Sequence, residues 1–330
     1  MVKASSTLDR VLVLEMVRVT EAAAIAASKL VGRGDEKAAD AAAVEAMRAA
    51  LNELPMDGTV VIGEGERDEA PMLYIGEKVG SAQGSGPRID IALDPLEGTT
   101  ITAQAGPNSL AVLAIAEEGG LLNAPDVYMN KLAVGPGYPE GVIDLAKSPT
   151  ENVTAVAAAK GVQPNEIIVC VLDRPRHEKL IAELRSMGCG IVLIPDGDVA
   201  GVIAVSNPET TIDMYMGSGG APEGVLAAAA LRCIGGQMQG RLLFENEEQV
   251  TRARGMGLAD PSKKLGILDM AHGDVMFAAT GVTDGPMLRG VRRTATGAIT
   301  HSIVMRSKSG TVRFVEGHHN FARKPASFVG

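Results

Sequence analysis

Residues 88–101, with the sequence RIDIALDPLEGTTI, constrain the fold more tightly than any other part of the chain. Isoleucine and leucine alternate with polar or small residues over residues 89–93, which is typical of a half-buried strand. Pro95 has no N–H to donate, so we expect the strand ladder to stop there. Gly98 allows a turn, and Thr99 then opens a helix. The stretch therefore predicts a strand, a tight turn and a helix in quick succession.

Two carboxylates stand in this turn, and their position suggests a chemistry. Asp94 and Glu97 lie at the expected end of the strand. Carboxylate oxygens are the ligands that hard divalent cations prefer. The free N–H groups at the start of the following helix would attract an anion such as phosphate. A cation site beside an anion site predicts a metal-assisted phosphate centre, and an acidic surface turn is the alternative.

The chain is long enough for two compact units. Its 330 residues favour two units of roughly 150 residues each. Prolines and glycines are densest over residues 135–141, so we place the boundary at about residue 140. The first unit, residues 1–140, would carry the acidic turn, and residues 141–330 would form the second. Hydrophobic residues make up 46% of the chain and aromatic residues only 3%, which predicts aliphatic cores where helices pack on sheets.

Charge and cysteine content narrow the function classes. The formal net charge of −9 argues against binding to nucleic acid or to an anionic membrane, since both need a basic surface. Cys170, Cys189 and Cys233 lie in apolar runs without zinc-site spacing, so buried free thiols are expected. Residues 1–30 carry scattered charges rather than a signal-peptide core, and no apolar run approaches the ~20 residues of a membrane span. We therefore expect a cytoplasmic protein.

Two helices and a strand are expected before the acidic turn. Apolar residues recur at helical spacing over residues 7–31 and again over residues 35–54. Asp40 stands among alanines in the second helix, where an ordinary solvated position is the alternative to a functional role. A short strand then leads into GEGE, residues 63–66, where small glycines would let the Glu64 carboxylate reach a shared ion. A solvated turn is the alternative for this loop.

Beyond residue 166 the sequence alternates regularly between strand and helix patterns. Polar or glycine-rich loops follow the strands, at the sheet edge where α/β proteins bind ligands. Three such loops cover residues 173–177, 196–198 and 217–224. The first carries two arginines suited to phosphate, the second two carboxylates suited to sugar hydroxyls or a cation, and the third places Glu223 at a helix start. Ordinary helix starts and caps are the alternative for all three.

The remaining segments give weaker signals. Residues 122–141 are expected to be rich in loops. Residues 299–319 predict a hairpin that turns at residues 309–310. His318 and His319, close to the end of the chain, are expected at the surface rather than in a ligand site.

The run DPLEGT, residues 94–99, closely resembles the DPxDGT/S signature of the lithium-sensitive, metal-dependent phosphatases, which include inositol monophosphatases and fructose-1,6-bisphosphatases. Asp40 and the GEGE loop stand in the order that this group uses. Two features depart from its usual form: Glu97 replaces an Asp, and GGAPEG, residues 219–224, replaces a Trp-Asp motif. With DRPRH, DGD and VIGEGERDEAPMLYIGE, these departures resemble the class II fructose-1,6-bisphosphatases of bacteria.

This resemblance implies a fold, an activity and a set of site residues. The fold is a layered α-β-α-β-α sandwich of two sheet-and-helix units with the site between them. The activity is hydrolysis of the 1-phosphate of fructose 1,6-bisphosphate in gluconeogenesis, by a homo-oligomer of two or four subunits. The divalent-metal environment is expected at Asp40, Glu64, Asp94, Glu97 and Glu223. The scissile phosphate is expected beside Glu97, Gly98 and Thr99, and the sugar with its second phosphate beside Tyr128, Arg174, Pro175, Arg176, Asp196, Gly197, Asp198 and Gly220.

Elementary chemistry supports a metal in such a centre. Several carboxylates this close repel one another unless two or more cations are bound, and oxygen ligands without Cys or His favour Mg²⁺ or Mn²⁺ over zinc. A bound ion lowers the pKa of water and neutralises phosphoryl oxygens. Our hypothesis is that the Thr99 hydroxyl, hydrogen-bonded to Glu64 or another carboxylate, orients and deprotonates the attacking water without a phosphoenzyme.

Two other functions stay open from the sequence. One is a related phosphatase that acts on sedoheptulose 1,7-bisphosphate, an inositol phosphate or a bisphosphonucleotide. The arginines at residues 174–176 favour a substrate with a second phosphate, but one extra hydroxymethine need not be rejected. The other is a regulatory protein that binds a sugar phosphate without catalysis, and the carboxylate cluster with Thr99 argues against it.

Overall fold

The computed structural model describes residues 12–65, 71–207 and 210–324. These residues form two compact units. One combines the chain up to Leu122 with the chain from His272 onward, and the other is Asn123–Ala271. This division differs from the expected one at residue 140, because the last part of the chain returns to the first sheet instead of extending the second.

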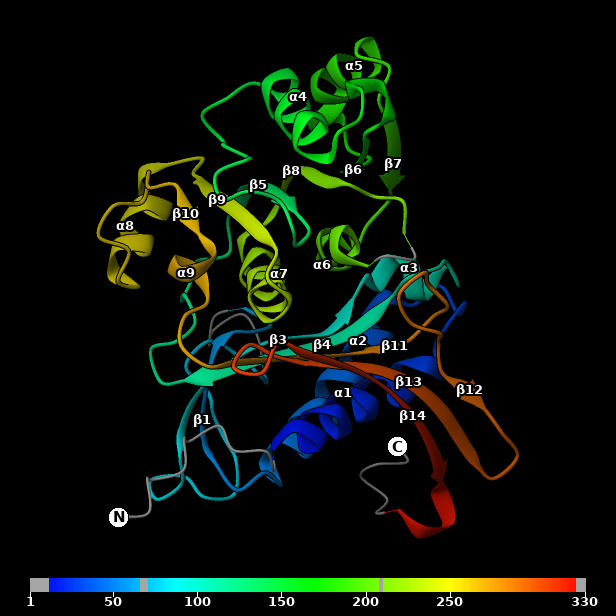
Figure 1. Cartoon of the computed structure of the whole chain (residues 1–330). Helices are drawn as coiled ribbons and strands as arrows, with labels where there is room; N and C mark the ends of the chain where they lie inside the picture. Colours follow the sequence, from blue (N-terminus) through cyan, green and yellow to red (C-terminus); the bar gives the residue numbers. More distant parts are fainter. Residues whose placement is uncertain (1–11, 66–70, 208–209, 325–330) are drawn as a thin grey trace. The chain divides into compact units, whose positions relative to one another are not determined.

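The first unit contains an eight-stranded sheet with the order β12-β13-β11-β4-β3-β1-β2, and β14 pairs with β13 (Figure 1). Its strands are β1 Asp57–Ile62, β2 Lys78–Val79, β3 Arg88–Glu97, β4 Leu110–Glu117, β11 Val275–Gly281, β12 Arg292–Arg293, β13 Gly297–Arg306 and β14 Thr311–Asn320. β1 and β3 are parallel, and the other pairs are antiparallel. The expected hairpin near residues 309–310 is confirmed as β13 and β14.

Helices α1 Leu12–Ser28 and α2 Glu36–Asn52 pack against each other, and both lie on one side of this sheet (Figure 1). The Asp35 side chain caps α2 by accepting from the Ala38 N–H at 3.0 Å, which accounts for its start. Both expected helices are confirmed, although residues 7–11 of the first lie outside the described residues. Their buried faces carry mainly alanine, valine, leucine and methionine, and each fully buried leucine or methionine contributes about 1.5–3 kcal/mol.

Strand β3 corrects one expectation at the acidic turn. The strand does not stop at Pro95 but continues to Glu97, which pairs with Leu110. The register shifts between Asp94 and Glu97, so the missing N–H of the proline falls in an irregular part of the ladder. Gly98 then turns the chain with φ +83°, and α3 Thr99–Ala103 begins at once, as expected.

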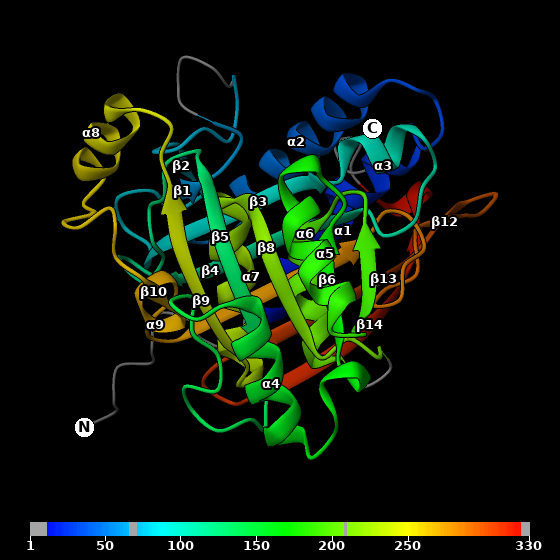
Figure 2. The same cartoon turned by 90° about the horizontal axis from the view of Figure 1, so that it is seen from above.

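The second unit contains a six-stranded sheet with the order β10-β9-β5-β8-β6-β7 (Figure 2). Its strands are β5 Tyr128–Val134, β6 Ile168–Leu172, β7 Gly190–Ile194, β8 Met214–Gly220, β9 Gln237–Leu243 and β10 Leu265–Gly266. Its helices are α4 Pro149–Lys160, α5 Glu178–Ser186, α6 Asp198–Ile203, α7 Ala221–Ile234, α8 Glu247–Gly255 and α9 Ile267–Met270. Helices α4 and α5 lie on one side of the sheet, and α6 and α7 on the other (Figure 1).

The expected alternation of strands and helices is confirmed in β6–α5, β7–α6 and β8–α7. Two expectations are corrected. β5 is an inner strand where a loop-rich segment was expected, because its neighbours β8 and β9 supply ladders on both sides. The glycines of residues 217–220 belong to β8 rather than to a loop, and α7 starts directly after them.

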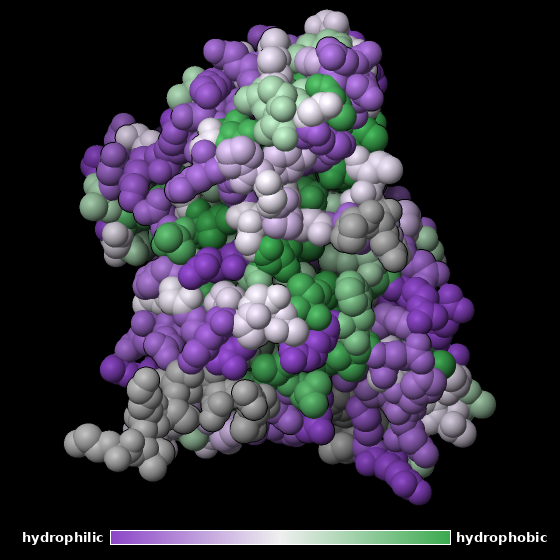
Figure 3. Space-filling view, in the orientation of Figure 1, coloured by the Kyte–Doolittle hydropathy of each residue, from purple (hydrophilic) through white to green (hydrophobic). Residues whose placement is uncertain are grey.

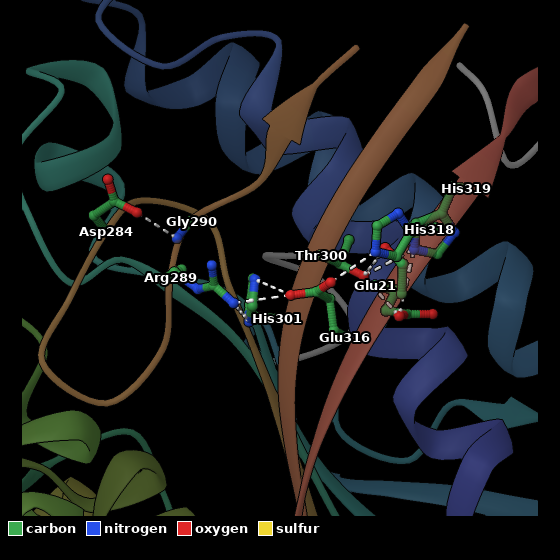
Figure 4. A network of polar contacts seen from close by, with 10 residues as sticks. Glu21, Asp284, Arg289, Gly290, Thr300, His301, Glu316, His318 and His319 are labelled. Carbon is green, nitrogen blue, oxygen red and sulfur yellow. Dashed lines mark hydrogen bonds and ion pairs between the residues drawn. The ribbon is translucent and has the colours of Figure 1, made fainter.

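Only one of the two histidines near the end of the chain lies at the surface, where both were expected. His318 is exposed, but the His319 side chain is only 6% exposed. Figure 4 shows that His319 meets Thr300 of β13 and Glu21 of α1, and the Thr300 hydroxyl donates to Glu21 Oε1 at 2.8 Å. The contact with Glu21 depends on tertiary packing, so the sequence near residue 319 gives no sign of it.

Four simpler findings complete the architecture. Cys170, Cys189 and Cys233 are buried free thiols, as expected. Among the described residues, no helix combines the length and the apolar content needed to cross a membrane. Figure 3 shows hydrophilic residues over the region of α8, whose acidic start and basic end fit an exposed helix. The two sheets and their helices confirm the α/β class.

Candidate active site

The first unit brings a carboxylate of the GEGE loop into an acidic environment. Glu64 follows β1, and its N–H donates to the Leu73 carbonyl at 3.1 Å. The neighbouring Gly63 lies so close to this carbonyl that a Cβ would stand 2.0 Å from its oxygen, so only glycine fits. Burial, followed by the negative charges of Asp94 and Asp40, raises the pKa of Glu64 to about 9.

Asp40 and Asp94 reach this environment from two different elements. Asp40 projects from α2, and burial raises the pKa of its carboxyl. Asp94 lies in the irregular part of β3, where its Oδ1 accepts from the Leu96 N–H at 2.9 Å. A backbone hydrogen bond in the irregular part of the ladder thus holds one oxygen of Asp94. The negative charge of Asp94 is still close enough to raise the pKa of Glu64.

Glu97 and Thr99 flank the left-handed Gly98. Glu97 is 4% exposed, and its carbonyl accepts from the Ser109 hydroxyl at 2.9 Å. Thr99 is the first residue of α3. Among the described residues, no hydrogen bond joins the Thr99 hydroxyl to Glu64, so that partnership stays a prediction.

The carboxylates of this group suit a hard divalent cation. Burial and like charges both disfavour ionisation of Glu64, and a cation would remove both penalties. As they stand, however, the described residues contain no group of three His, Cys, Asp or Glu side chains arranged to hold an ion. Closing a site would therefore require these carboxylates to move together around the ion.

In the second unit, the arginine loop is fastened to β8. Arg176 donates to the Ser218 carbonyl at 2.8 and 3.2 Å, and its guanidinium lies 4.7 Å from the centre of the Tyr128 ring. His177 is buried and receives the Ser218 N–H at Nε2 over 2.8 Å, while Nδ1 donates to the Leu172 carbonyl at 2.7 Å. Burial lowers the pKa of His177, which keeps the ring neutral in this role.

Arg174 lies on the same loop and faces the next one. It donates to the carbonyl of Pro195 and stands 3.6 Å from the Asp196 carboxylate. Pro175 starts a short 3-10 turn, Pro175–His177, which stiffens the loop between the two arginines. The predicted arginine and DGD loops are therefore neighbours in the structure.

A cavity of about 410 Å³ opens beside Arg176 within the second unit. Leucine and methionine side chains form part of its lining, and its polar lining includes Lys147, Lys179 and Ser218. The acidic lining residue Glu183 already accepts from the Thr150 N–H and hydroxyl at 3.1 and 2.8 Å. The cavity therefore offers a cationic rim suited to an anionic group.

The DGD and GGAPEG motifs lie on this unit too. Gly197 has φ +79° and allows α6 to begin at Asp198. Gly220 ends β8, and a Cβ there would stand 1.9 Å from Oε2 of Glu223 in the first turn of α7. Glycine at residue 220 therefore leaves room for the Glu223 carboxylate.

Similar proteins identify the family to which the chain belongs. The family described as "Bacterial fructose-1,6-bisphosphatase, glpX-encoded" matches residues 10–319. The chain belongs to this family. Fructose-1,6-bisphosphatase 1 class 2 of Escherichia coli (strain K12) is 47% identical over 329 residues, which cover 96% of this chain and 97% of that protein. The class 2 fructose-1,6-bisphosphatases of Escherichia coli O6:H1 and Shigella flexneri show the same identity and coverage.

Membership of this fructose-1,6-bisphosphatase family confirms the resemblance inferred from DPLEGT and the later motifs. The structure gathers Glu64, Asp40 and Asp94 electrostatically in the first unit. In the second unit it joins Tyr128 to Arg176 by stacking. Sequence reasoning missed His177, Ser218, Lys131 and Tyr215, which hold these loops, because their partners are distant in the chain. The one available signal for Lys131 was that it is the only charged residue between residues 127 and 139 of the sequence.

Proposed function

We infer that the chain hydrolyses the 1-phosphate of fructose 1,6-bisphosphate and releases fructose 6-phosphate and phosphate, as a step of gluconeogenesis. Family membership over nearly the whole chain carries this conclusion. The acidic environment of Glu64 and the arginine loop support it, since a phosphatase for a bisphosphate needs a reactive centre and a second anion site. The metal, the residue roles and the assembly below are our proposals.

We propose that the reaction uses two or more Mg²⁺ or Mn²⁺ ions. Carboxylates would hold them, namely Asp40, Glu64, Asp94, Glu97 and Glu223. When bound, such ions supply an activated water and neutralise the phosphoryl and leaving oxygens. The raised pKa of Glu64 supports this assignment, because a buried carboxylate beside two others needs a counter-charge to ionise at neutral pH.

Thr99 and Glu64 are the catalytic residues in this proposal. The Thr99 hydroxyl orients the attacking water at the start of α3, and a carboxylate of the cluster, Glu64 in our assignment, accepts the proton that passes through the hydroxyl. The water attacks the phosphorus directly, and the sugar oxygen leaves on the opposite side. Gly98 and Glu97 keep the turn narrow enough for the phosphate to approach the backbone.

The second unit supplies substrate binding in this proposal. Arg174 and Arg176, held apart by Pro175, bind the second phosphate, for which the cationic cavity beside Arg176 offers room. Tyr128 packs under that guanidinium. The loop Asp196, Gly197 and Asp198, together with Gly220, contacts the sugar hydroxyls.

Phosphate release from a panel of substrates tests the function. We expect fructose 1,6-bisphosphate to be hydrolysed fastest, with activity that requires Mg²⁺ or Mn²⁺ and disappears with a chelator. We expect sedoheptulose 1,7-bisphosphate to be hydrolysed as well, because one extra hydroxymethine need not be rejected. Faster hydrolysis of inositol 1-phosphate than of fructose 1,6-bisphosphate would overturn the assignment.

A homo-oligomer of two or four subunits in the cytoplasm is the remaining part of the proposal. The buried free thiols support a reducing compartment. Light scattering of the purified protein measures the assembly, and a monomeric mass at working concentration would contradict it.

A further inference from the structure

A fully buried lysine lies beneath the DGD loop. The Lys131 side chain is 0% exposed, and its Nζ donates to Oδ2 of Asp198 at 2.5 Å. Asp198 is itself only 5% exposed. A buried lysine with one carboxylate partner is costly to desolvate, and an apolar pair of similar size would stabilise the fold at least as well. The pair therefore calls for an explanation other than stability.

A second donor reaches the same oxygen. Tyr215 is 0% exposed, and its hydroxyl donates to Asp198 Oδ2 at 3.4 Å. Burial, followed by the charge of Asp198, raises the pKa of Tyr215, so the hydroxyl keeps its proton as a donor. Among the described residues, both hydrogen bonds to this carboxylate end at Oδ2, and none ends at Oδ1. One oxygen is fixed, and the other is available as an acceptor.

The surrounding backbone is built around this pair. Lys131 on β5 stands opposite Gly217 of β8 and Gly240 of β9. A Cβ on Gly219 would lie 1.8 Å from Asp198 Oδ2 and 3.2 Å from Lys131 Nζ. Any side chain at residue 219 would therefore push the carboxylate away from the ammonium. A glycine inside a strand weakens it, so the glycine at residue 219 reflects the room that the pair needs.

The pair also links the elements that carry the predicted sugar contacts. Asp198 opens α6 directly after the left-handed Gly197, Lys131 lies three residues after Tyr128 on β5, and Tyr215 lies on β8, which ends at Gly220. We propose that Lys131 and Tyr215 are positioning residues that fix Asp198 Oδ2, so that Oδ1 accepts a hydrogen bond from a hydroxyl of the sugar. This inference rests on the proposed binding of the sugar by the DGD loop.

Three variants and a set of substrates test the inference. Lys131→Met removes the ammonium but keeps the stem, Tyr215→Phe removes only the hydroxyl, and Lys160→Met is the matched control. Lys160 forms an ion pair of the same length, 2.5 Å, with Asp213 in the same unit. We expect KM for fructose 1,6-bisphosphate to rise about tenfold in Lys131→Met and about threefold in Tyr215→Phe, with kcat within about threefold. The control should keep the KM of the unmodified protein.

Deoxy analogues separate positioning from a general loss of structure. The unmodified protein should bind one of 3-deoxy- and 4-deoxyfructose 1,6-bisphosphate less well than the parent sugar, and Lys131→Met should lose that discrimination. Equal KM increases on every substrate, or no discrimination by the unmodified protein, would overturn the inference. If Lys131→Met does not fold in a thermal melt, Tyr215→Phe decides, and an unchanged KM and discrimination in it would overturn the inference. Absence of phosphate release by the unmodified protein would instead refute the proposed function.

Discussion

Two buried carboxylates, one in each unit, lie in opposite electrostatic environments. In the first unit, Glu64 lies among carboxylates, and both its burial and their negative charges oppose its ionisation. In the second, Asp198 has a lysine at 2.5 Å and a tyrosine hydroxyl on the same oxygen. In our proposal a cation completes the first arrangement, whereas the chain itself organises the second. The proposed reactive and binding functions thus differ in how much of the required charge the fold supplies.

Glu64→Gln tests the proposed reactive role of the first unit most directly. We expect turnover of fructose 1,6-bisphosphate to fall about 10³-fold, because a metal-holding and proton-accepting group is lost. The metal-free protein should melt at a higher temperature at neutral pH, because folding no longer requires residue 64 to take up a proton. Steady-state kinetics and thermal melts without metal measure both effects.

Glu45→Gln is the matched control, since Glu45 is an exposed residue of α2. It should change neither turnover nor the melting temperature. Undiminished turnover in Glu64→Gln would show that the acidic environment does not serve the reaction.

Thr99→Ala should lower kcat about 100-fold and leave KM within about twofold, since the hydroxyl acts on the attacking water rather than on substrate binding. Thr99→Ser keeps the hydroxyl and should recover most of the activity. An equal loss in the serine and alanine variants would point to the methyl group or the helix start, and it would remove Thr99 from the catalytic role.

Arg176→Ala tests the proposed binding role of the second unit. We expect KM for fructose 1,6-bisphosphate to rise about tenfold with kcat nearly unchanged, because the contact exists before and during the reaction. With fructose 1-phosphate, which lacks the second phosphate, the variant and the unmodified protein should have similar KM values. Arg185→Ala, at an exposed residue of α5, serves as the control. A similar loss on both sugars would exclude a role in binding the second phosphate.

In the metal-free protein, the free energy of unfolding should depend on pH. The folded-state pKa of Glu64 is raised to about 9 from an ordinary 4.5, so the folded protein holds this proton more tightly than the unfolded chain. Its contribution to stability is therefore full below about pH 4.5 and is lost as pH rises toward 9, with a slope of at most about 1.4 kcal/mol per pH unit. Urea unfolding at several pH values measures the slope, and Glu64→Gln should flatten it. A slope unchanged by that substitution would assign it to other groups.

Local chemistry explains which parts of the molecule the sequence predicts. The helix at Thr99 follows from a glycine with positive φ, and the alternation from β6 to α7 follows from short apolar runs divided by polar loops. Family motifs supplied the site residues beyond these local signals. The division into units could not be read locally, because the return of β11 to β4 depends on pairing between residues that lie far apart, such as Val275 and Ala116.

The residues that hold the loops of the candidate site could not be predicted from the sequence for the same reason. Lys131 and Asp198 are 67 residues apart in the chain, so no local pattern predicts their contact. His177 sits inside the DRPRH motif, yet its partner Ser218 lies on β8. Residues that act on a ligand leave recognisable motifs, whereas residues that hold them depend on the finished tertiary structure.

The path of the chain through the first unit has a consequence for synthesis on the ribosome. The second unit is an insertion: the chain leaves the first unit after Leu122 and re-enters at His272, whose N–H donates to the Gly120 carbonyl at 2.9 Å. Strand β4 is synthesised long before its neighbour β11. The edge of β4 that pairs with β11 therefore stays unpaired while the insertion is translated. The insertion can fold as it emerges, and its closely spaced ends then bring β11 back to β4.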